Sequence, residues 1–497
     1  MVEKQLDKIL KKNTLYHLGF AQDVPGFNVG IAALSCILLI QKRQKDISIS
    51  EDSSLSSYTS ETLLDELMDM GVAVDCDYDE IIRRIQDEKY IFIDSEDRYS
   101  SGKLSIILTH VFSLVYPTME GMLLIAYLVE TAKSVKSIGN NIKKTLTQVD
   151  QTLRSQGVSV GMEKMPQGYG PVLNKIVFHP HVAIGNGEIR PSSFATIFRE
   201  RARKRKRVIV YLENSMKKKG DLPVLPLNGR SMKQQMAQHL YSTSDISDII
   251  LSDVAMIINI LKKANQGGKK KAIATISHAI MLLGNDELHK TIEAFTSLDD
   301  IDDADLRKEF EHFFVTSYMS NSITRHYAMK SEIKDIEQMC ICSMIHNLGQ
   351  MIVLYYYPEA YNQIKKITLQ HNNKRRAARE VLGTTYDNIG IYFATEWHLP
   401  FTTIESLRVC YFNRIGKTRD NLIINLPFCS GELCAFLGGG LDKRQTMRLR
   451  ELVNSLNLFS RELSSLLEKA WNDTKAFSKK QKISITKREL AKIAATG

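Results

Sequence analysis

The sequence predicts a mainly α-helical protein, with an all-helical C-terminal half and an N-terminal helical region that carries a possible small winged-helix module. Apolar residues beyond position 220 recur at three- and four-residue spacing, as in Val254, Ile257, Ile258 and Leu261, without sustained alternation. Gly284 and Gly383 stand where helices should stop. At 497 residues, the chain is too long for one ordinary core. We expect an N-terminal regulatory region (1–198), a basic linker (199–220), a helical domain (221–470) and a polar tail (471–497).

The composition is that of a soluble globular protein, with 43% hydrophobic and 25% charged residues. The seven cysteines are scattered, so we expect reduced, buried thiols and a cytoplasmic location. Two apolar runs, Val29–Ile40 and Leu104–Tyr116, fall short of the ~20 residues that a membrane helix needs. We expect both to be buried helices and predict no membrane span.

Helix and strand patterns alternate in the N-terminal region between residues 60 and 99. A helix is expected from Ser60 to Met70, and a second one from Tyr78 to Lys89. An apolar strand at 90–93, a polar turn at 94–97 and a short strand at 98–99 follow. This is the order of elements in a winged helix.

The residues between the N-terminal module and position 198 give weaker patterns. Residues 104–156 are expected to be helical, with an apolar stripe that packs inside its own chain or, as an alternative, against a second copy in a homodimer. The stripe consists of Val135, Ile138, Ile142, Val149 and Leu153. Residues 157–192 look irregular, and His179 and His181 fit an ordinary loop better than a metal site.

Charge is separated along the chain. Residues 61–97 hold 13 acidic and three basic side chains, whereas Arg199–Arg207 holds seven basic residues and one acidic residue. Such separation indicates contacts with differently charged surfaces, inside or outside the protein. The basic stretch is a possible anion-binding patch, and the alternatives are a solvated helix face or a partner for the acidic region. The patch would comprise Arg201, Arg203, Lys204, Arg205, Lys206 and Arg207.

Several motifs beyond residue 220 resemble the HDOD domain family in order and spacing. The opening Leu222-Pro223-Val224-Leu225-Pro226 is similar to that family's Leu-Pro-x-Leu-Pro, and the runs Ile249–Asn265 and Ile273–Leu288 resemble its next two helical blocks. Ser343–Leu354, Leu382-Gly383, Trp397 and the closing Leu456–Leu463 follow in register. The resemblance implies an all-helical domain over about 250 residues and leaves the first 220 outside it.

The same resemblance implies that a metal site has been lost. HDOD domains are related to HD phosphohydrolases, which hold a divalent metal with a histidine, a His-Asp pair and a later aspartate around an open position for water. Here the pair reads His346-Asn347, and Thr316, Tyr386 and Tyr411 stand at the other ligand positions. Asparagine brings no charge and the tyrosines would close the site. We therefore expect no metal and no cofactor.

We interpret the chain as a non-catalytic signalling or regulatory protein whose HDOD domain binds a protein partner or a ligand. One alternative is a residual HD-type phosphohydrolase that acts on a nucleotide. The other is a nucleic-acid-binding regulator, which the acidic residues of the winged-helix candidate disfavour because nucleic acid is densely negative. Neither a Walker A motif nor an H-E-x-x-H motif occurs.

Overall fold

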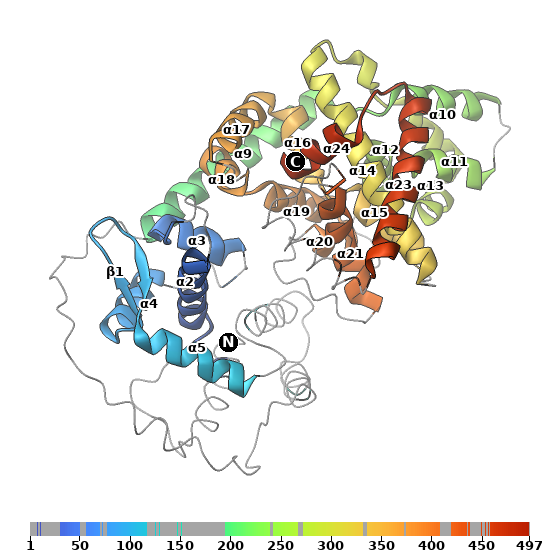
Figure 1. Ribbon diagram of the computed structural model, residues 1–497. Coiled ribbons are helices and arrows are strands. Elements are labelled where there is room, and N and C mark those ends of the chain that lie inside the picture. The colour runs from blue at the N-terminus through green and yellow to red at the C-terminus, as the bar shows by residue number, and fades with distance from the viewer. Residues whose placement is uncertain are drawn as a thin grey trace. The chain divides into compact units, whose positions relative to one another are not determined.

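The chain divides into two compact units, Met1–Arg199 and Glu200–Gly497. The computed structural model (Figure 1) describes mainly these residues: 30–49, 56–69, 77–116, 194–238, 242–266, 272–331, 335–371, 374–407, 419–434 and 458–496. The apolar stripe at 135–153 (apart from single residues), the two histidines at 179 and 181, and Tyr411 lie outside them.

The first unit gathers its elements around one buried helix. Helix α2 (Ile31–Ile49) packs against α4, α5, β2 and α3. The other elements are α3 (Ser60–Asp69), α4 (Tyr78–Asp87), β1 (Ile91–Ile93), β2 (Tyr99–Ser101) and α5 (Lys103–Val115). Strands β1 and β2 pair antiparallel, with Phe92 opposite Ser100. The helices and strands expected between residues 60 and 99 are therefore present in the expected order, whereas the name winged helix stays a prediction.

One serine fastens the hairpin to the helical part of this unit. The backbone N–H of Ser60 donates to the Asp97 carboxylate at 2.8 Å, and its hydroxyl donates to the same carboxylate at 2.6 Å. The Ser60 hydroxyl also lies 2.9 Å from the hydroxyl of Tyr99, which is buried. Asp97 has a positive φ of 59° in the hairpin turn. The polar turn expected at 94–97 thus also caps the first turn of α3.

Where the structure describes it, the second unit is all-helical apart from an isolated bridge between Val224 and Ser297. The mainly α fold class is therefore confirmed. Its central helix is α14 (Ala304–Lys330), which packs on α15, α16, α21, α23 and α24. The remaining elements in chain order are α9 (Phe194–Lys219), α10 (Pro226–Gln238), α11 (Thr243–Ile250), α12 (Val254–Ala264), α13 (Ile276–Glu293), η1 (Leu298–Asp300), α15 (Ile336–Met344), α16 (Leu348–Tyr356), α17 (Pro358–His371), α18 (Lys374–Leu382), α19 (Tyr386–Glu396), α20 (Phe401–Ser406), α21 (Arg419–Cys434), α23 (Ser460–Gln481) and α24 (Lys487–Thr496).

The segment expected as a basic linker is helical. Residues 199–219 form most of α9, which buries Val208 and Leu212 in the core of the second unit. The four-residue spacing of these two side chains gives the helix one apolar stripe. The second unit accordingly starts near residue 200 and not after 220.

The segment expected as a polar tail is also folded. Residues 471–497 contain the second half of α23 and all of α24, and Phe477, Ile483 and Leu490 are buried in the same core. Helix α24 packs on α14 and α21. The three apolar residues are spaced six and seven apart among lysines, so their common burial was hidden in the sequence.

The opening Leu222–Pro226 segment is tied to the domain by Asp253. This carboxylate caps α12 by accepting the N–H groups of Ala255 and Met256, and it also accepts the N–H of Leu225 at 2.8 Å. Burial raises the pKa of Asp253 to about 6, although its N–H donors favour the charged form. The aspartate therefore holds the prolines of the opening segment against the start of a core helix.

The apolar segments have the burial expected of core helices. The run at 29–40 lies largely in α2, and the run at 104–116 lies largely in α5. The stretch Ile336–Tyr356 is long and apolar enough to cross a membrane by composition, and 89% of its most apolar window is buried within the protein. The cysteines described by the structure, Cys36, Cys340, Cys342, Cys429 and Cys434, are free and buried.

Candidate functional site

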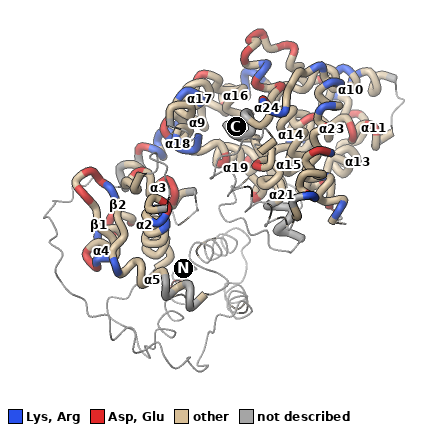
Figure 2. Tube along the Cα trace, in the orientation of Figure 1, with Lys and Arg blue, Asp and Glu red and all other residues tan. Residues whose placement is uncertain are grey.

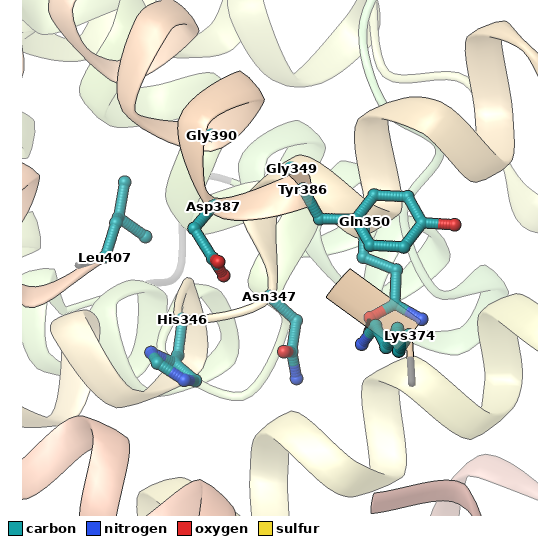
Figure 3. Close-up of a pocket in the computed structure, with 9 residues that line it drawn as sticks. All are labelled: His346, Asn347, Gly349, Gln350, Lys374, Tyr386, Asp387, Gly390 and Leu407. Carbon is teal, nitrogen blue, oxygen red and sulfur yellow. Dashed lines mark hydrogen bonds between the residues drawn. The ribbon is translucent and has the colours of Figure 1, made fainter. Parts of the chain in front are cut away.

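A pocket lies where the degenerate His-Asp pair was expected. His346 and Asn347 occupy the turn between α15 and α16, and the walls come from α16, α18 and α19 and the residue after α20 (Figure 3). Its volume of about 20 Å³ suffices for about one or two water molecules. The lining residues are His346, Asn347, Gly349, Gln350, Lys374, Tyr386, Asp387, Gly390 and Leu407.

The pocket is small because α16 and α19 approach each other through two glycines. A Cβ added to Gly349 would stand 1.8 Å from the Tyr386 carbonyl oxygen and 2.6 Å from the Gly390 nitrogen. A Cβ added to Gly390 would stand 3.0 Å from the Gly349 nitrogen. Only glycine at position 349 permits this separation, so the crossing of the two backbones limits the space beside Asn347.

Three of the five residues expected at the former ligand positions come together here. His346, Asn347 and Tyr386 line the pocket. Thr316 does not, because it is buried within α14 and its hydroxyl donates to the carbonyl of His312, four residues earlier. Tyr411 lies outside the described residues.

The pocket also contains a lysine that sequence reasoning missed. The Lys374 ammonium donates to the Gln350 side-chain oxygen and lies 5.3 Å from the centroid of the Tyr386 ring. Burial lowers the pKa of Lys374 to about 8, and the nearby Asp387 acts in the opposite direction. The pocket therefore holds its own cation beside a hydrogen-bonding amide.

The carboxylate of the pocket already has a partner. Asp387, one residue into α19, forms an ion pair with Arg375 at 2.9 Å, and each side chain is 26% exposed. Arg375 follows Lys374 in α18, so two consecutive cations face the first turn of α19. Asp387 is a single carboxylate and cannot by itself neutralise both Lys374 and Arg375.

His346 is buried beside an aromatic ring at the edge of the pocket. Its ring meets Phe428 edge to face, with 5.8 Å between the centroids, and a Cβ on Gly431 would come within 3.3 Å of its Cδ2. Burial lowers the pKa of His346. Its buried Nδ1 has no hydrogen-bond partner among the protein atoms described. His346 is thus a buried histidine with one ring nitrogen that has no hydrogen-bond partner among the described residues.

The donor set of this pocket does not fit a divalent metal. A catalytic metal needs several deprotonated ligands around an open coordination position. Here an imidazole, an amide and a carboxylate paired with Arg375 share about 20 Å³ with the Lys374 ammonium. Across the described part of the chain, no group of three or more His, Cys, Asp or Glu side chains is arranged to hold a metal.

The predicted anion-binding patch lies on α9, and none of its residues lines the pocket. Arg203, Lys204, Arg205, Lys206 and Arg207 are exposed, and Arg201 is partly buried. Figure 2 shows these cations along α9. The chain turns at Gly383 (φ +71°), and the backbone of α9 passes so close to this glycine that an added Cβ would lie 2.7 Å from the Arg201 carbonyl oxygen. The patch therefore lies on a helix that packs against the other helices of the second unit.

Comparison with known proteins agrees with the all-helical second unit. The model of the HDOD domain family matches residues 222–411. An uncharacterized protein of Treponema pallidum (strain Nichols) is 25% identical over 194 residues, which cover 38% of this chain and 37% of that protein. The chain thus spans little more than a third of the length of this relative.

Three solved structures are similar at low identity. The MmoQ response regulator from Methylococcus capsulatus str. Bath has a TM-score of 0.40 and 16% identity, covering 50% of this chain and 98% of that one. A virulence factor from Campylobacter jejuni subsp. jejuni has a TM-score of 0.42 and 19% identity, with coverage of 54% and 96%. An HDOD domain protein from Geobacter sulfurreducens has a TM-score of 0.31 and 13% identity, with coverage of 56% and 97%.

The match to the HDOD domain family falls within the helical second unit. Residues 222–411 of this chain form an HDOD domain. The helices α21, α23 and α24 follow the matched region and complete its core by packing on α14 or on one another.

Proposed function

We propose that the protein is a non-catalytic regulatory protein whose HDOD domain binds a partner or ligand. The observation that carries the proposal is the Lys374 ammonium, which donates to Gln350 inside the pocket where a catalytic metal would need anionic ligands. A fixed cation at this point repels a divalent ion. The match of residues 222–411 to the HDOD domain family also supports a regulatory role.

The test is metal content and hydrolysis by the full chain. Protein purified without chelator is analysed for metals and assayed on cyclic dinucleotides and simple phosphoesters with Mn²⁺ or Fe²⁺. We expect less than one metal per ten chains and no turnover above that of His346→Ala. The matched control is His398→Ala, because His398 is exposed and outside the pocket.

The second candidate is a residual phosphohydrolase, which the presence of Asp387 and His346 in one pocket favours. It predicts one metal per chain that is lost on His346→Ala and retained on His398→Ala, together with turnover that follows the metal. That result would overturn the non-catalytic proposal.

The third candidate, nucleic-acid binding through the winged-helix-like module, finds little support in its charges. Helix α4 carries Asp79 and Glu80 in its first turn, and Asp87 and Glu88 follow at its end. A phosphate backbone would be repelled by such a helix. We propose a protein-contact role for this module instead. Replacing the charged side chains of α4 by neutral ones should then leave the affinity for nucleic acid unchanged.

A further inference from the structure

Helix α9 presents a line of cations on the face opposite its buried side. Successive residues turn by about 100°, so Arg203, Lys206 and Arg207 point away from Val208 and Leu212. Lys217 and Lys218 continue the same face three turns later. All five cations are exposed, whereas Val208 and Leu212 are buried. We call these five residues the α9 stripe, which is about 22 Å long from residue 203 to 218.

Contacts with neighbouring helices of the second unit hold α9 in place. Glu213 accepts a hydrogen bond from the Tyr392 hydroxyl at 2.9 Å, and the ring of Tyr211 lies 4.2 Å from that of Tyr357. Lys219 donates to the Tyr355 carbonyl at 2.8 Å at the end of the helix. These contacts with α19, α16 and the residue after α16 orient the helix, so the cations need no further ordering to form a linear array.

The charge of the stripe is not cancelled within the described part of the chain. None of its five cations has a carboxylate within ion-pair distance there, in contrast to Lys262, which pairs with Asp221 at 2.7 Å. Glu213 is the only acidic residue of α9 between Arg203 and Lys219, and it is engaged by Tyr392. The second unit therefore carries a line of exposed, uncompensated positive charge.

We propose that the α9 stripe binds the sugar-phosphate backbone of a nucleic acid without reading its sequence. Phosphates repeat every few ångström along a strand and suit a line of Arg and Lys side chains. A membrane surface is a poorer match, because an interfacial helix needs a broad apolar face. Between Arg207 and Lys217 the exposed large apolar residues of α9 are Val210 and Tyr211, and the Tyr211 ring packs against Tyr357. An acidic protein is the competing partner. The inference deepens the proposed regulatory role by naming a partner, and it uses residues outside the pocket.

The experiment measures binding of the full chain to a fluorescein-labelled 24-nucleotide strand and to its duplex between 50 and 200 mM salt. Five phosphate contacts predict a slope of about −4 to −5 in log K against log salt for the duplex. The variant Arg203→Glu/Lys206→Glu/Arg207→Glu should bind at least tenfold more weakly at 50 mM salt, with a slope smaller by about three.

A second triple variant controls for net charge. Lys308→Glu/Lys469→Glu/Lys475→Glu changes the charge equally at exposed lysines elsewhere in the second unit, and it should keep most of the affinity. Circular dichroism verifies that both variants fold. Equal losses in the two variants, or stripe-dependent binding of poly-glutamate with none of either nucleic acid, would overturn the proposal. Neither result bears on metal content, so failure of the nucleic-acid proposal can be distinguished from failure of the proposed non-catalytic function.

Discussion

Gly349 is the residue on which the crossing of α16 and α19 depends. Its replacement by alanine would place a methyl group 1.8 Å from a backbone oxygen of the other helix, and backbone atoms cannot rotate away. We expect Gly349→Ala to lower the free energy of unfolding by about 3 kcal/mol or more. Urea denaturation followed by circular dichroism measures this change.

The matched control for that substitution is Gly229→Ala in α10. A Cβ there would approach only the Val224 side chain, at 3.2 Å, and alanine favours a helix by about 1 kcal/mol over glycine. This variant should be neutral within about 1 kcal/mol. An equally mild effect at Gly349 would mean that the helices are farther apart than described.

Lys374 makes stability depend on pH in the alkaline range. Its folded pKa of about 8 lies below the unfolded value near 10.5, so the unfolded chain binds more protons between these limits and stability rises with pH. The destabilising effect of burying the ammonium is fully present below pH 8 and is relieved above it. Relative to Lys374→Met, the wild type should gain about 1–2 kcal/mol from pH 7 to 9.5.

Denaturation midpoints of both proteins at several pH values in this range provide the measurement. Lys366→Met on neighbouring α17 serves as the control, because Lys366 is exposed and its removal should leave the pH profile parallel to that of the wild type. A profile for Lys374→Met that runs parallel as well would show that the ammonium is fully solvated.

At the scale of elements, Asp253 joins the opening segment to α12. Asp253→Ala removes a helix cap and leaves the buried N–H of Leu225 without its acceptor. The expected loss is about 2–4 kcal/mol, the sum of a cap and one unsatisfied buried donor. Thermal unfolding compares this variant with Asp248→Ala, which changes an exposed aspartate of α11 and should cost less than about 1 kcal/mol. Similar losses in both would rule out the anchoring role.

The elements that were predicted well from the sequence are those in which apolar residues recur at a regular spacing and in which the residues at both ends are typical of a boundary. The helix expected at 78–89 is observed at Tyr78–Asp87, and the strand expected at 90–93 is observed at Ile91–Ile93. The packing of α9 into the core was missed, since seven of the nine residues from 199 to 207 are basic and mask its apolar stripe. Helix ends that depend on local spacing are visible in a sequence, whereas burial of a charged helix depends on what it packs against.

The pocket was predictable only in part for the same reason. His346 and Asn347 are adjacent and were found through their motif, but Lys374 and Asp387 are 27 and 40 residues away from Asn347. Their approach follows from the packing of α18 and α19, which no spacing rule encodes. The run Lys374-Arg375-Arg376 places three cations directly before the buried Ala377-Ala378 pair, and this pattern could have indicated a helix with a charged side and a packed side.

At the scale of the whole molecule, the folded second unit should correspond to residues 200–497. A fragment covering 221–470 lacks α9, α24 and the end of α23, and so loses the burial of Val208, Phe477 and Leu490. Each large apolar side chain contributes about 1.5–3 kcal/mol when buried. We expect the 200–497 fragment to unfold cooperatively on heating and the 221–470 fragment to aggregate or to melt without a sharp transition.

Calorimetry of the two fragments, with the full chain as reference, decides between the boundaries 200–497 and 221–470. A sharp transition of the 221–470 fragment at the same temperature as that of the longer one would show that the flanking helices contribute nothing to the core. Separate transitions of the full chain, one of which matches the 200–497 fragment, would agree with two units that unfold independently.

The lysine inside the pocket also bears on how such a site could change over evolutionary time. A substitution of Asn347 to aspartate would supply the carboxylate that metal ligation needs, but the Lys374 ammonium in the same pocket would neutralise it first. The intermediate would gain an internal ion pair and no metal. A path to metal-dependent hydrolysis would therefore require the loss of Lys374 before the gain of any ligand, and selection for activity could not reward that first step.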